Sequence, residues 1–310
     1  MEKVPLGKTG LEVSRLGVGL AEIGYELSFE EISQAGEVLN SALDSGINFL
    51  DTAACYSISE ELIGRTISHR RADFVLATKA GHVADAYKGE AWSYQTVADS
   101  VDRSLKRLNT DHLDIIQLHS CGIDVLERGD AIRALQDAKA AGKLRHVSYS
   151  GDNEDAHWAV DSGLFDTLQT SFNLTEQGAR TSGLLEKANK RGMGVIIKRP
   201  IGGGTWARAR RGEEAARGYD NEYLRRAKEM ASDGPLPEEP ADPILLALGF
   251  TLSQPEVNVA IVGTKNPAHM ASNIRMANEQ LPVSGTAITE LQKRWDAHAP
   301  DGNQDWKQLM

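Results

Sequence analysis

Four side chains in the first half of the chain have the chemistry of a proton-transfer site: Asp51, Tyr56, Lys79 and His119. A tyrosine of ordinary pKa, about 10, is a weak acid that a neighbouring ammonium group makes stronger. Lys79 could supply that ammonium group, Asp51 could keep Lys79 charged, and His119 could orient and polarise a substrate oxygen. Such a set delivers a proton to an oxygen atom and contains no metal-binding cage.

Eight short β-branched or aliphatic runs alternate with longer segments of helical spacing, which predicts a parallel sheet built from βα units. Eight such units close a TIM barrel, an α/β fold. Catalytic groups of these barrels lie where the strands end, and Asp51, Lys79 and His119 follow the second, third and fourth runs. The runs begin at Arg15, Ile47, Phe74, Leu113, Leu144, Asp166, Gly194 and Val257.

Two segments are additional to the eight units. The residues from Val4 to Val13 predict an N-terminal β-hairpin that closes the barrel floor. The long loop after strand 7, residues 199–241, is either a functional lid or disordered segment, or a solvated helical excursion. It follows the end of a strand, so it lies on the active face of the barrel.

The composition fits a globular protein that acts on small molecules. The chain has 310 residues, 41% of them hydrophobic, and a formal net charge of -10, which gives no general attraction for nucleic acid or an anionic membrane. Two cysteines, Cys55 and Cys121, suit a reducing compartment, and the N-terminus lacks the apolar run of a signal peptide. We expect a single domain over 1–310, cytoplasmic, without a membrane span or a metal.

Several motifs occur in order along nearly the whole chain. They are the residues 46–56 (GINFLDTAACY), 59–64 (SEELIG), 76–79 (LATK), 113–119 (LDIIQLH) and 142–145 (GKLR). Their order and the spacing from Asp51 to Tyr56 resemble the aldo-keto reductases. The resemblance implies hydride transfer from a nicotinamide cofactor to an aldehyde or ketone, while Tyr56 protonates the oxygen.

The same resemblance implies where the cofactor lies. Ser150, Gln169 and Asn173 would hold the nicotinamide carboxamide. The adenosine phosphate end would lie along Gly263, Thr264, Lys265 and Asn273. NADPH is the first expectation, and NADH is not excluded.

The sequence departs from the family pattern at both ends of that cofactor. Ser150 is followed by Gly151 and Asp152 where many relatives have Ser-Asn, and the seventh strand ends in Lys198, Arg199 and Pro200 instead of an aromatic residue. We expect the aliphatic stem of Lys198 to cover the nicotinamide ring. At the 2′-phosphate, the basic residue, hydroxyl and downstream arginine of the relatives correspond to Gly263, Thr264 and His269.

Two other functions remain open at this stage. Lys79 could be the Schiff-base nucleophile of an aldolase, since barrel lysines at strand ends serve that role. The chain could also be a non-catalytic, nucleotide-binding regulatory subunit. Aromatic residues after the third strand, Tyr87, Trp92 and Tyr94, either wall a substrate pocket or anchor a loop. Neither the particular carbonyl substrate nor the oligomeric state follows from the sequence.

Overall fold

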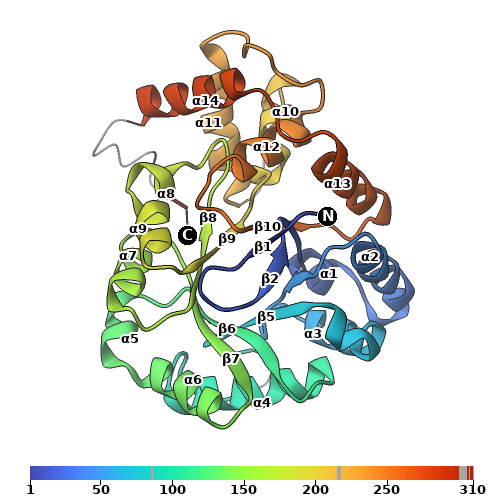
Figure 1. The fold of residues 1–310 in the computed structure, drawn as a ribbon, viewed down its shortest axis with the longest axis vertical. Helices are drawn as coiled ribbons and strands as arrows, with labels where there is room; N and C mark the ends of the chain where they lie inside the picture. Colours follow the sequence, from blue (N-terminus) through green and yellow to red (C-terminus); the bar gives the residue numbers. More distant parts are fainter. Residues whose placement is uncertain (85–86, 215–217, 300–305, 307, 310) are drawn as a thin grey trace.

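A closed barrel of eight parallel strands forms the centre of the protein (Figure 1). The computed structural model describes residues 1–84, 87–214, 218–299, 306, 308 and 309. The strands are β3 (Leu16–Gly19), β4 (Phe49–Asp51), β5 (Val75–Ala80), β6 (Leu113–His119), β7 (Leu144–Ser150), β8 (Thr167–Ser171), β9 (Gly194–Lys198) and β10 (Val259–Gly263). Each pairs with the next, and β10 pairs with β3. The predicted TIM barrel is therefore confirmed, and the eight strands fall on the eight predicted runs.

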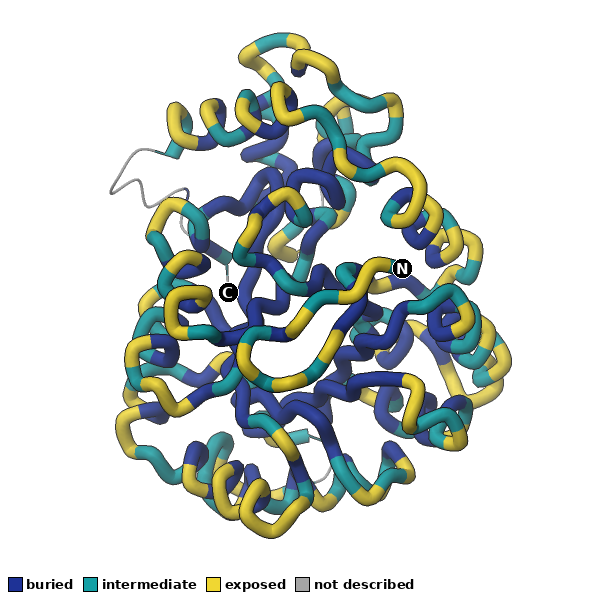
Figure 2. Tube along the Cα trace, viewed as in Figure 1, coloured by how far each residue is buried: buried dark blue, intermediate teal, exposed yellow. Residues whose placement is uncertain are grey.

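Helices surround the barrel and turn their exposed faces outward (Figure 2). In α4, for example, Val97, Val101 and Leu108 are buried at helical spacing, and the Ser93 side chain caps the first turn by accepting from the Thr96 amide. The helices are α1 (Ala21–Glu26), α2 (Ile32–Asp44), α3 (Ser59–Thr66), α4 (Tyr94–Leu108), α5 (Ile123–Arg128), α6 (Asp130–Ala140), α7 (Asn153–Ser162), α8 (Gly178–Thr181), α9 (Leu184–Lys190), α10 (Thr205–Arg210), α11 (Asp220–Ser232), α12 (Pro243–Leu252), α13 (Pro267–Glu279) and α14 (Gly285–His298), with short 3-10 turns η1 (Phe29–Glu31), η2 (Ser68–Asp73) and η3 (Gly202–Gly204).

The N-terminal hairpin closes one end of the barrel, as predicted. Strands β1 (Lys3–Pro5) and β2 (Glu12–Ser14) pair antiparallel and cross the barrel opening in Figure 1. Leu6 and Val13 from this hairpin pack against Phe49 in a buried apolar cluster. The catalytic face must therefore be the opposite end, where the strands finish.

The long connection between β9 and β10 is helical. Of the two alternatives given for residues 199–241, this is the helical excursion. It contains η3, α10 and α11 before α12 begins, and residues 215–217 within it lie outside the described part. Helix α11 buries Tyr223, Leu224 and Met230 on one face, so it is packed onto the body. The connection nevertheless reaches the active face, because Tyr219 and Asp220 line the cavity described below.

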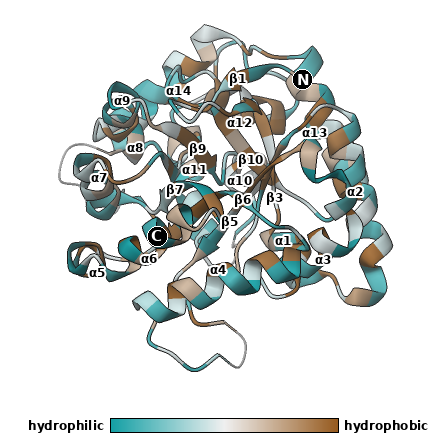
Figure 3. Cartoon of the chain, turned by 60° about the horizontal axis from the view of Figure 1, so that its bottom comes forward, coloured by the Kyte–Doolittle hydropathy of each residue, from teal (hydrophilic) through white to brown (hydrophobic). Residues whose placement is uncertain are grey.

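Apolar residues concentrate in the strands and in α12, whereas the outer helices are largely hydrophilic (Figure 3). Among the described residues, no helix combines the length and the apolar character needed to cross a bilayer. Most of the buried hydrophobic residues form one cluster shared by the strands and the helices around them.

Candidate active site

A cavity of about 630 Å³ opens where the barrel strands end. Its lining includes nine of the residues predicted for catalysis or cofactor binding: Asp51, Tyr56, His119, Ser150, Gln169, Lys198, Arg199, Pro200 and Gly263. Lys79 lies just beneath it and is almost fully buried. Asn173, Thr264, Lys265, His269 and Asn273 are not part of the lining, whereas Glu22, Tyr25, Glu26 and Asp220, which the sequence did not single out, are.

Strand register brings Lys79 to Asp51. Asp51 on β4 pairs with Ala77 on β5, and Lys79, two residues further, points to the same side of the sheet. The Lys79 Nζ donates to Asp51 Oδ2 at 2.5 Å and to the Thr52 carbonyl at 2.9 Å. Gln117 completes the arrangement by donating to Asp51 Oδ1 at 2.7 Å. The carboxylate is thus held on both oxygens inside the barrel.

This ion pair lies against the tyrosine. The Lys79 Nζ is 4.9 Å from the centre of the Tyr56 ring. Burial raises the pKa of Tyr56, while the Lys79 ammonium opposes that rise. Burial also works against the charge of Lys79, but the Asp51 carboxylate and Tyr56 outweigh it and raise the pKa of Lys79. At neutral pH the site therefore contains a protonated tyrosine beside a permanent ammonium ion.

His119 is held in its neutral form at the end of β6. Its ring centre is 5.7 Å from that of Tyr56 and 4.7 Å from that of His82. Burial, followed by the charges of Lys79 and the neighbouring groups His82 and Lys198, lowers the pKa of His119 well below its ordinary value. A neutral imidazole beside the tyrosine can donate a hydrogen bond from one ring nitrogen and accept one at the other.

The aromatic residues after β5 serve mainly as anchors. Trp92 Nε1 donates to the His119 carbonyl at 3.1 Å. The same indole lies so close to Gly81 that a β-carbon there would be 2.2 Å from Trp92 Cδ1. Tyr87 and Tyr94 donate to acidic residues of α4 and α6, and neither lines the cavity. Of the two interpretations of these residues, the structure favours loop anchoring.

All three predicted carboxamide ligands form hydrogen bonds within the protein. Gln169 donates to Asp51 Oδ1 at 2.8 Å and accepts from the Ser150 hydroxyl at 3.0 Å. Asn173 donates to the Arg199 carbonyl at 3.0 Å and accepts from the amide and hydroxyl of Thr175. Ser150 and Gln169 still border the cavity, but the Asn173 side chain organises its own turn.

The two departures from the family pattern next to the nicotinamide form one ion pair. Lys198 Nζ lies 2.8 Å from Asp152 Oδ2, and the Asp152 side chain is 1% exposed. Burial opposes the charge of Asp152, but Lys198 and the donors on Ser171 and Thr170 outweigh it and lower its pKa. Gln308, near the C-terminus, donates to Asp152 Oδ1 at 3.0 Å. Lys198 is therefore held at its ammonium end.

The Gly263 end of the cavity is acidic. Lys265 Nζ forms an ion pair with Glu26 Oε2 at 2.8 Å. A β-carbon on Gly263 would lie 3.9 Å from Glu22 Oε2, so a carboxylate stands beside the position where relatives have a basic residue. Two arginines of the 199–241 segment pair with acidic residues: Arg208 with Glu213, and Arg210 with Glu239.

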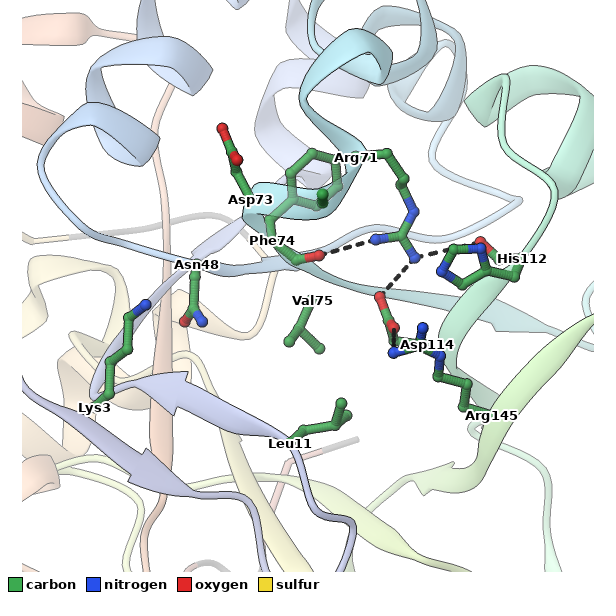
Figure 4. A pocket seen from close by; sticks show the side chains of 11 residues that line it. Lys3, Leu11, Asn48, Arg71, Asp73, Phe74, Val75, His112, Asp114 and Arg145 are labelled. Atoms are coloured by element: carbon green, nitrogen blue, oxygen red, sulfur yellow. Dashed lines mark hydrogen bonds and ion pairs between the residues drawn. The ribbon is translucent and has the colours of Figure 1, made fainter.

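A second cavity, about 580 Å³, lies at the opposite end of the barrel, next to the hairpin (Figure 4). Asp114 is its centre: it accepts from Arg71 at 2.6 Å and from the Leu76 amide at 2.8 Å, and it pairs with Arg145 at 3.1 Å. These charges satisfy one another, so the cluster joins the starts of three strands. Within the described residues, no group of three or more His, Cys, Asp or Glu side chains could hold a metal ion.

Comparison with known proteins agrees with this geometry. The model of the Aldo/keto reductase family matches residues 15–292. This chain belongs to the aldo/keto reductase family. It is similar to the uncharacterized oxidoreductase YqkF of Bacillus subtilis, with 29% identity over 90% of this chain and 92% of the relative. It is also similar to the L-galactose dehydrogenase of Arabidopsis thaliana, with 27% identity over 88% of this chain and 87% of the relative.

A solved structure agrees with the family assignment. The aldo-keto reductase AKR11C1 of Bacillus halodurans, in its holo form, matches this aldo/keto reductase with a TM-score of 0.80 and 25% identity, covering 95% of this chain and 96% of that one. An oxidoreductase that uses a nicotinamide cofactor is therefore established at the level of the family.

Proposed function

We propose that this aldo/keto reductase reduces aldehydes or ketones to alcohols, with Tyr56 as the proton donor. The observation that carries the proposal is the buried Lys79 ammonium, which is fixed by Asp51 and lies against the Tyr56 ring at the edge of the cavity. An ammonium in this position stabilises the tyrosinate that remains after the proton has left. The product alcohol gains one hydride at carbon and one proton at oxygen.

The residues around the cavity suit a nicotinamide dinucleotide. Ser150, Lys198 and Arg199 line the cavity, and Gly19 and Gly263 line it without a side chain of their own. When bound, the cofactor supplies the hydride. Tyr56 gives its hydroxyl proton to the carbonyl oxygen, Lys79 stabilises the charge left on Tyr56, and His119 orients the oxygen by a hydrogen bond.

We propose NADH as the preferred cofactor, ahead of the NADPH that the sequence favoured. A 2′-phosphate at the Gly263 end would approach the Glu22 carboxylate, and Lys265 is already paired with Glu26. A like charge that faces a dianionic phosphate disfavours its binding, whereas carboxylates accept hydrogen bonds from a ribose diol. A fluorescence titration with NADH and NADPH tests this preference, and tighter binding of NADPH would refute it.

The protonated state of Lys79 argues against an aldolase activity. A Schiff-base nucleophile must lose its proton, but Asp51 and Tyr56 raise the pKa of Lys79. Borohydride in the presence of a carbonyl compound should therefore leave Lys79 unlabelled.

Substitution of Tyr56 tests the mechanism. Tyr56→Phe should bind NADH with unchanged affinity but should lose turnover with a panel of aldehydes, because only the hydroxyl is removed. Tyr25→Phe is the matched control, since Tyr25 lines the same cavity and its hydroxyl bonds only the Cys55 carbonyl among the described residues. Equal turnover by Tyr56→Phe and the wild type would exclude Tyr56 as the acid. A wild type that binds cofactor and turns over no carbonyl would indicate the regulatory subunit.

A further inference from the structure

The ring nitrogens of His119 have different surroundings. A neutral imidazole carries one proton, and the hydrogen bond made by one nitrogen decides which nitrogen holds it. Cys55 Sγ lies 3.4 Å from His119 Nδ1. No other residue in the described part of the chain makes a hydrogen bond to this ring. Nε2 is thus the nitrogen available to a molecule in the cavity that His119 lines.

Both partners of this contact are fixed by their neighbours. Cys55 directly precedes Tyr56 in a turn in which the Ala54 amide donates to the Lys79 carbonyl at 3.2 Å. The backbone of His119 ends β6, and its carbonyl accepts from Trp92. The thiol and the imidazole are therefore held together by the same elements that position the tyrosine and the lysine.

We propose that Cys55 is a positioning residue whose thiol donates its hydrogen to His119 Nδ1, so that the single ring proton stays on Nε2 and faces the substrate oxygen. His119 then acts as a hydrogen-bond donor to the carbonyl. The opposite tautomer would present a lone pair to that oxygen and would repel it. The functional part of this inference rests on the proposed carbonyl reduction, whereas the tautomer itself does not.

The chemistry of the thiol favours this direction of the hydrogen bond. Burial raises the pKa of Cys55, so the group keeps its hydrogen at neutral pH. Thiol sulfur is a weak acceptor, whereas an unprotonated imidazole nitrogen is a good one. The ring remains neutral because burial and the surrounding cations exclude a second proton.

Nitrogen-15 NMR of the histidine-labelled, full-length protein tests the proposal without cofactor or substrate. The wild type should show His119 as the Nε2–H tautomer, Cys55→Ala should show a mixture of tautomers, and Cys55→Ser should restore the Nε2–H form because its hydroxyl can donate in place of the thiol. Cys121→Ser is the matched control, since Cys121 is the other cysteine of the chain, and it should leave the His119 signals unchanged.

Turnover measurements on the same variants test the functional part. Loss of one hydrogen bond that orients the ring should lower kcat of Cys55→Ala by about threefold to tenfold, with little change in the Kd of the cofactor. Cys55→Ser should recover most of that loss. A wild-type Nδ1–H tautomer, or a wild-type tautomer in Cys55→Ala, would overturn the proposal. A changed tautomer with unchanged kcat would overturn the role in catalysis, and a wild type without any carbonyl turnover would refute the proposed function while leaving the tautomer assignment in place.

Discussion

Asp152 and Lys198 form one ion pair, but loss of Asp152 should lower the free energy of unfolding much more than loss of Lys198. Asp152 accepts from Thr170 at 2.8 Å, from the Ser171 amide at 2.7 Å and from Gln308 at 3.0 Å, besides its pairing with Lys198. Lys198 forms its ion pair with Asp152, its one ion-pair partner among the described residues. Removal of the carboxylate therefore strands the cation, whereas removal of the cation leaves the carboxylate with four donors, since the Ser171 hydroxyl also donates to it at 3.3 Å.

The expected costs follow from this difference. Breaking a buried pair so that one charge is left uncompensated costs about 3 to 5 kcal/mol. Because the Lys198 side chain is 16% exposed to the cavity, we expect Asp152→Asn to cost about 3 kcal/mol, near the lower limit. Lys198→Met keeps a stem of similar length and removes one charged hydrogen bond, so about 1.5 kcal/mol is expected.

Urea unfolding at pH 7 measures both variants and the double variant. The two single costs should not add, because each single variant already breaks the same pair. Asp161→Asn is the control: Asp161 pairs with Lys187 on the surface, with side-chain exposures of 53% and 37%, and should cost under about 1 kcal/mol. If Lys198→Met destabilised the protein as much as Asp152→Asn, the asymmetry argued from the hydrogen bonds would be refuted.

Three further predictions concern the active site, the cofactor and pH. Asp51→Asn should lower kcat by about 100-fold or more without weakening NADH binding, because the ammonium beside the tyrosine loses its counterion; single-turnover kinetics and a titration measure the two quantities. Glu22→Lys should shift the ratio of NADPH to NADH affinity toward NADPH by about tenfold, and an unchanged ratio would place the phosphate elsewhere. Partial burial opposes the charge of Asp166, yet hydrogen bonds from His146 and Lys139 outweigh it and lower its pKa to about 2. Because the pKa is lowered, ionised Asp166 stabilises the folded protein above pH 4, and this stabilisation is lost as the pH falls through 2. Asp166→Asn should therefore cost about 1 kcal/mol at pH 7, after allowance for exposure, and nothing near pH 2.

The barrel and the cluster of acid and base groups were accessible from the sequence because both depend on local patterns. An aliphatic run followed by a chemically active residue marks a strand and its end, and the fold places all such ends in one ring. Asp51 and Lys79 meet because neighbouring parallel strands pair in register, which follows from the order of the units. The side chains Gln117 and Gln169, which cross the barrel interior to Asp51, have no such local signal.

The charges around the cofactor could not be predicted because their partners lie far apart in the chain. Asp152 follows β7 and Lys198 ends β9, and β8 lies between these two strands, so the pairing of neighbouring strands does not predict their ion pair. Glu22 and Glu26 lie in a short helix after the first strand, where nothing in their spacing indicates contact with Gly263 or Lys265. Such pairings depend on the three-dimensional packing of a loop against the last βα unit.

The two buried ion pairs together support the proposal that the tyrosine, and not the histidine, is the acid. Burial lowers the pKa of His119, and the charges of Lys79 and Lys198, the cations of the two pairs, lower it further. Protonation of the imidazole is therefore unfavourable from two sides. The same Lys79 favours loss of the Tyr56 proton. The same charges are thus consistent with both proposed roles: Tyr56 transfers the proton, and His119 orients the oxygen, a role in which the position of its single ring proton matters most.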